Sequence, residues 1–75
     1  MTTQQIQDEW FTGQRVSGAS FTLNEVVRIS AGSHAGKIGS VISLLDLQPQ
    51  TRYIVETSSG RDVEVFEYEL ERYDA

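Results

Sequence analysis

The sequence predicts an all-β domain, a small antiparallel barrel or sandwich of four to five short strands. Apolar and polar residues alternate with a period of two through most of residues 24–70, a pattern typical of half-buried strands. Residues that favour turns separate these stretches at short intervals. The chain has 75 residues, which suits one small core, because a chain of this size buries only about 60 % of its unfolded surface.

A short helix is predicted for residues 2–12, ahead of the strands. Trp10 and Phe11 lie near its end, and Gly13 would terminate it. A helix this short is marginal on its own, so it must dock or fray. We favour the interpretation that Trp10 packs against the end of the domain, and the alternative is that Trp10 and Phe11 contact a partner. Residues 14–21 indicate a loop or a weak edge strand.

The first clear strand is predicted within residues 24–31, where Val27, Ile29 and Ala31 would share one face. Residues 37–47 are richer in apolar side chains and carry them on both faces. This second pattern predicts a strongly bent central strand that is buried on each side at different points.

Two further strands are predicted within residues 52–58 and 61–70. A turn over residues 47–51, which contains the only proline, precedes them, and the Ser-Ser-Gly sequence of residues 58–60 predicts a tight hairpin between them. From this alternation we expect one set of side chains to face inward: Val27, Ile29, Val41, Leu44, Tyr53, Val55, Val63, Val65 and Leu70.

Three glycines lie close together in AGSHAGKIGSV, residues 31–41. The stretch is not a phosphate loop, because its glycine spacing is one residue short and Ile38 replaces the hydroxyl residue that binds magnesium. A strand pattern follows it, whereas a phosphate loop opens a helix. We therefore interpret the glycines as architectural. Gly32 would end a strand, Gly36 would supply a positive φ, and Gly39 would mark a bulge or a sharp bend.

Residues 26–44, VVRISAGSHAGKIGSVISL, resemble a KOW motif, and the resemblance extends over about residues 24–72. The matching positions are Val27, Ile29, Gly32, Gly36, Gly39 and Val41, followed later by Gly60 and Leu70. The family includes a ribosomal protein of the large subunit and the C-terminal domains of NusG-type transcription factors. The resemblance implies a five-stranded SH3-like barrel in residues 24–75, with residues 1–23 as the N-terminal helix and loop of the same single domain. It also implies a protein that binds RNA or protein and performs no chemistry.

In this family the loop between the first two motif strands often makes contacts. The candidate binding residues are those of this loop, two strand arginines and two N-terminal aromatic residues: Ser33, His34, Lys37, Arg28, Arg52, Trp10 and Phe11. The simpler alternative is that the charged residues are ordinary solvated side chains. A stacking patch of Tyr53 with the arginines would suit unstacked bases, but Tyr53 falls on the inward face, which favours core packing.

Glu67, Glu69 and Glu71 alternate with Phe66, Tyr68 and Leu70, so on a continuous strand their carboxylates would share one face. Paired carboxylates can act as acid and base or hold a hard cation when one of them is desolvated. Nothing in the sequence indicates a concave site, so we expect a solvated acidic edge that discourages aggregation.

The net charge of −5 argues against tight, nonspecific binding to nucleic acid. Residues 26–54 carry three cations against Asp46, a mildly basic segment between two acidic ends. The ribosomal members of the family are strongly basic, so a protein partner is the favoured expectation. The alternative is an RNA or ribosome contact in translation or transcription through the three central cations. A less favoured reading is an accessory subunit of an enzyme that works only in a complex.

We expect neither a cofactor nor a small-molecule substrate. The chain has no cysteine and a single histidine, His34, so no thiolate or paired-histidine metal site is predicted. MTTQQIQDEWF lacks the basic and apolar regions of a signal peptide, and no apolar run approaches the roughly 20 residues that span a bilayer. A cytoplasmic protein without membrane contact is therefore expected, as a monomer or a weak dimer paired through an edge strand.

Overall fold

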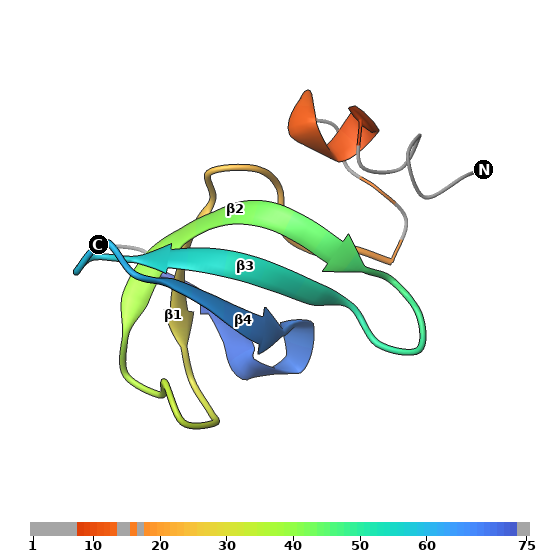
Figure 1. Cartoon of the computed structure of the whole chain (residues 1–75). Helices are drawn as coiled ribbons and strands as arrows, with labels where there is room; N and C mark the ends of the chain where they lie inside the picture. The colour runs from red at the N-terminus through yellow and green to blue at the C-terminus, as the bar shows by residue number, and fades with distance from the viewer. Residues whose placement is uncertain (1–7, 14–15, 17, 74–75) are drawn as a thin grey trace.

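Five antiparallel strands form one curved sheet in the computed structural model, which describes residues 8–13, 16 and 18–73 (Figure 1). The strands are β1 (Val26–Ile29), β2 (Ile38–Asp46), β3 (Arg52–Thr57), β4 (Asp62–Phe66) and β5 (Leu70–Arg72), with a 3₁₀ turn, η1 (Glu67–Glu69), between the last two. Their order in the sheet is β4-β3-β2-β1-β5. The predicted small all-β, SH3-like architecture is confirmed, although β4 and β5 are the two sheet edges, so the sheet is not closed.

The strand alternation places one face of the sheet in the core. The nine side chains of the predicted inward set are buried: Val27, Ile29, Val41, Leu44, Tyr53, Val55, Val63, Val65 and Leu70. The prediction for Ala31 is wrong, because β1 ends at Ile29 and Ala31 lies exposed in the loop that follows. The alternation of apolar and polar residues continues through Ser30 and Ala31, although β1 ends at Ile29.

The central strand β2 is bent, as its two-sided apolar pattern predicts. Its register against β3 shifts between Val41 and Ser43 and again between Leu44 and Asp46, which marks irregular pairing at two places along the strand. Such irregularities increase local twist and let a short sheet curl. Figure 1 shows the resulting curvature of β2 and β3.

Gly39 has a different role from the expected bulge. It pairs in regular register with Thr57, away from both register shifts. A Cβ atom at Gly39 would overlap the Glu56 carbonyl oxygen and lie 2.8 Å from Val55 Cγ1. Glycine is therefore required here because the backbone of β3 approaches too closely for any side chain.

The loop of residues 30–37 joins β1 to β2 as a tight turn. Gly36 adopts a φ of +93°, and its N–H donates to the Ile29 carbonyl at 2.7 Å. The positive φ predicted for this glycine is confirmed. Because β2 begins at Ile38, a strand and not a helix follows Lys37, as the rejection of a phosphate loop requires.

The N-terminal segment completes the core. Residues 8–11 are helical, whereas the start of the predicted helix falls outside the described residues. Trp10 is fully buried, and its Nε1 donates to the Phe21 carbonyl at 2.9 Å. Val16, Ala19 and Phe21 are buried in the same cluster, so with Trp10 they belong to one hydrophobic core with the sheet.

Candidate functional site

Arg28 and Arg52, the two arginines predicted to bind a partner, both make ion pairs on the surface. Arg28 Nε donates to Glu71 Oε1 at 2.5 Å, between β1 and β5. Arg52 Nε donates to Asp46 Oδ2 at 2.8 Å, and its Nη1 lies 3.8 Å from Glu64 Oε1. The hydrogen bond and the charge of Asp46 raise the pKa of Arg52 above its ordinary value. Carboxylates of this chain thus already neutralise the two arginines that were candidates for phosphate contacts.

The loop between β1 and β2 exposes Ser33 and Lys37, and His34 lies half-buried between them. Lys37 Nζ lies 3.4 Å from His34 Nδ1. Among the described residues, Lys37 makes no ion pair. The loop therefore offers one accessible cation beside an imidazole.

The three central cations do not form one patch. Arg28 pairs in register with Ile38 at the start of β2, so it lies at the same end of the sheet as Lys37. Arg52 pairs in register with Asp46 at the far end of β2. A strand rises about 3.3 Å per residue, so the nine residues of β2 separate the two ends by roughly 25 Å when straight and by less when bent.

The two N-terminal aromatic residues have different environments. Trp10 is inaccessible, so its expected role in contacting a partner is wrong, and the packing interpretation is confirmed. It is buried because the helical turn places its ring against Tyr53, with ring centres 6.3 Å apart. Phe11 remains 46 % exposed and meets the Trp10 ring edge-on at 5.3 Å.

A shallow groove lies at the end of the sheet that holds Arg52. It has a volume of about 350 Å³ and is lined by Asp46, Pro49, Gln50, Arg52, Phe66 and Tyr68. We name this feature the Tyr68 groove. The rings of Phe66 and Tyr68 are stacked, with centres 5.2 Å apart and planes 10° from parallel. Tyr68 is 68 % exposed, which makes it the most exposed large apolar side chain among the described residues.

The turn η1 creates this aromatic stack by interrupting the alternation after β4. The Glu69 carboxylate accepts a hydrogen bond from the Phe66 N–H at 2.9 Å, and the Glu67 N–H donates to the Thr51 carbonyl at 2.9 Å. These contacts fix the turn against the loop between β2 and β3. Tyr68 is exposed whereas Leu70 is buried, although one continuous strand would place the two side chains on the same face.

The same turn overturns the expected acidic edge. Glu67 accepts hydrogen bonds from the Ser20 N–H at 2.6 Å and from the Tyr53 hydroxyl at 2.7 Å, Glu69 caps the turn, and Glu71 binds Arg28. The three carboxylates do not share one solvated face, because η1 breaks the strand on which they would alternate. In the described part of the chain, no group of three metal-ligating side chains comes together.

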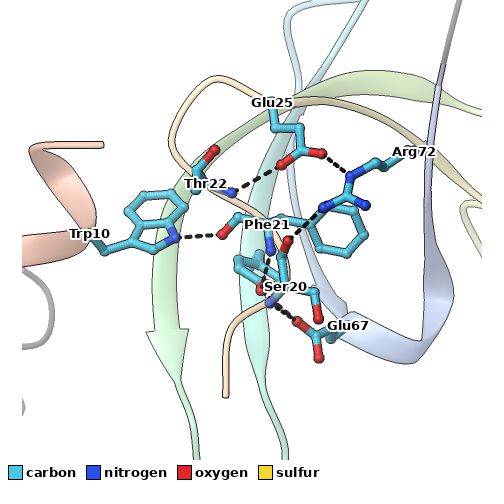
Figure 2. A network of polar contacts seen from close by, with 8 residues as sticks. Trp10, Ser20, Phe21, Thr22, Glu25, Glu67 and Arg72 are labelled. Carbon is cyan, nitrogen blue, oxygen red and sulfur yellow. Dashed lines mark hydrogen bonds and ion pairs between the residues drawn. The ribbon is translucent and has the colours of Figure 1, made fainter. Parts of the chain in front are cut away.

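A polar network holds residues 18–25, which we call the strap, against the sheet (Figure 2). Arg72 Nη2 donates to the Ser20 carbonyl at 3.2 Å, and Arg72 Nε donates to Glu25 Oε2 at 2.7 Å. The Phe21 N–H donates to the Tyr53 hydroxyl at 3.3 Å. Burial, followed by the hydrogen bond to the Glu67 carboxylate, raises the pKa of Tyr53. This network is structural, because its groups satisfy one another.

Comparison with protein-family models, with curated proteins and with solved structures gave no match to this chain. No helix in the described residues combines the length and apolar character that a membrane span requires. The case for a site rests on the geometry of the chain. Of the predicted site residues, only Arg52 lines the Tyr68 groove, and the sequence pattern missed Pro49, Phe66 and Tyr68. Of these three residues, only Pro49 stood out in the sequence, as the single proline in the turn before β3.

Proposed function

We propose that this chain is a non-enzymatic, KOW/SH3-like binding module that contacts a protein partner through the Tyr68 groove. The observation that carries the proposal is the exposed stack of Phe66 and Tyr68 beside an open groove. Aromatic side chains are enriched at protein interfaces, where a few of them supply most of the binding free energy. An outward-facing stack of two rings makes no contribution to the core comparable to that of Trp10 or Tyr53.

The arrangement of charge favours protein over RNA. RNA binding would use several accessible cations together, because phosphate neutralisation supplies most of the affinity. Arg28 and Arg52 are paired with carboxylates, and Lys37 lies at the opposite end of β2 from Arg52. The one cation beside the aromatic stack in the groove is Arg52, which is paired with Asp46.

The proposal is tested by affinity capture from the native host, with and without nuclease, using wild-type protein and three variants. We expect wild type to retain the same protein after nuclease treatment. Tyr68→Ala should reduce its recovery about tenfold or more, which matches the loss of a binding hot spot. Phe11→Ala is the matched control, because it removes another exposed aromatic ring distant in sequence from the groove.

The third variant, Lys37→Glu, distinguishes the RNA alternative. Capture that disappears with nuclease and with Lys37→Glu, but persists in Tyr68→Ala, would show that the module binds RNA through the loop between β1 and β2. Capture that survives nuclease and is equal in wild type and Tyr68→Ala would show that the groove is not the contact.

A further inference from the structure

We infer, on the basis of the proposed function, that the Tyr68 groove receives an arginine side chain of the protein partner. The first reason is the shape of the platform. Phe66 covers one face of the Tyr68 ring, and the side chain remains 68 % exposed. Among the described residues no other ring stacks on Tyr68, and its 68 % exposed side chain leaves most of its surface available to a flat group.

The second reason is charge. Residues 64–69 contain three acidic residues, Glu64, Glu67 and Glu69, and no base, and they include both rings of the stack. Within the groove, Arg52 is the only cation, and it already interacts with Asp46 and with Glu64. The Glu64 side chain is 65 % exposed and lies 3.8 Å from Arg52, so most of its hydrogen-bonding capacity faces solvent. A cation is therefore the complementary ligand.

The third reason is the preference for arginine over lysine. A guanidinium is flat, stacks on aromatic faces and donates in a fork to a carboxylate, whereas an ammonium is compact and strongly hydrated. Tyr68 supplies the stacking face, and Glu64, on β4 two residues before Phe66, supplies an exposed carboxylate. A groove of about 350 Å³ is at the small end of ligand sites, which suits one or two side chains of a partner and not a large ligand.

The test is a titration of ¹⁵N-labelled chain, followed by NMR, with the peptide acetyl-Gly-Arg-Gly-Arg-Gly-amide. Matched peptides carry lysine or citrulline in place of arginine, and citrulline keeps the shape of the side chain without its charge. We expect shifts confined to residues 46–52 and 64–69. The arginine peptide should bind about threefold more tightly than the lysine peptide and about tenfold more tightly than the citrulline peptide, and more weakly as salt increases.

Variants separate the contributions of stacking and charge. Tyr68→Ala should abolish the shifts, Tyr68→Phe should retain them, and Glu64→Gln should weaken binding about threefold. Phe11→Ala should bind like wild type. Equal binding of the citrulline and arginine peptides, shifts centred on residues 30–37, or no shifts with any peptide would overturn the inference.

These outcomes are separable from those of the proposed function. Tyr68-dependent capture of a protein, combined with no preference for the arginine peptide, would leave the groove as the contact and reject arginine as its ligand. Capture that does not depend on Tyr68 would reject the proposed function, whatever the peptides do.

Discussion

Replacing Trp10 with alanine should remove a large part of the stability of this chain. The indole is fully buried, and its Nε1 donates to the Phe21 carbonyl. Truncation of a buried aromatic residue to alanine costs about 3–5 kcal/mol, because apolar contact is lost and a cavity remains. A domain of 75 residues has a free energy of unfolding of about 4–11 kcal/mol, so the variant should lose between about a quarter and all of it.

The measurement is urea unfolding followed by far-UV circular dichroism, because the substitution removes the only tryptophan. With a denaturant slope of about 1–3 kcal/mol per molar urea, we expect the midpoint to fall by 1 M or more. Phe11→Ala is the control, since Phe11 adjoins Trp10 but is 46 % exposed, and it should cost less than about 1.5 kcal/mol. Trp10→Phe should fall between the two, because it keeps a ring but leaves the Phe21 carbonyl without its donor.

One result would refute the reasoning. If Trp10→Ala and Phe11→Ala differed by less than about 0.5 kcal/mol, the helical residues 8–11 would not form part of the core, and the contact between Trp10 and Tyr53 would carry no stability.

Three further perturbations address the strap, the sheet and the ion pairs. Because the pKa of Tyr53 is raised in the folded chain, its hydroxyl ionises at lower pH in the unfolded chain. The contribution of Tyr53 to the free energy of unfolding should therefore be constant below about pH 10 and fall by up to 1.4 kcal/mol per pH unit above it. Urea unfolding between pH 8 and 11 measures this, and a slope as steep in Tyr53→Phe would assign it to other groups. Gly39→Ala should cost about 1–3 kcal/mol in thermal or urea unfolding because its Cβ meets the backbone of β3, whereas the neighbouring Ser40→Ala should cost less than about 1 kcal/mol. A double-mutant cycle of Glu25→Gln and Arg72→Gln should give a coupling of about 0.5–1 kcal/mol that shrinks in 1 M salt, and a coupling unaffected by salt would contradict an electrostatic origin.

The sheet could be predicted from the sequence because strand alternation is a local property. Val27, Val41 and Val55 face the core in the positions that the period-two pattern assigns. The buried residues ahead of β1 could not be predicted in the same way. Val16 and Phe21 lie in an irregular segment that has no period, and their burial depends on contacts with residues far along the chain.

The groove could not be predicted because a tertiary contact creates it. The sequence from Phe66 to Leu70 alternates without interruption, so one continuous strand would place Tyr68 on the same face as Leu70. The hydrogen bond from the Glu67 N–H to the Thr51 carbonyl joins η1 to another loop, and no local pattern reports it. Arg28 and Arg52 could be identified from the sequence as candidate binding residues. Their carboxylate partners could not, because strand pairing brings Glu71 and Asp46 beside them.

The strap has a consequence for synthesis on the ribosome. Ser20 and Glu25 are held by Glu67 and Arg72, which are 47 residues or more further along the chain. A nascent chain cannot form these contacts until residue 72 has left the exit tunnel, so the strap stays without these partners until then. Contacts over such distances also slow folding. The strap should therefore dock only after residues 67–72 have been synthesised.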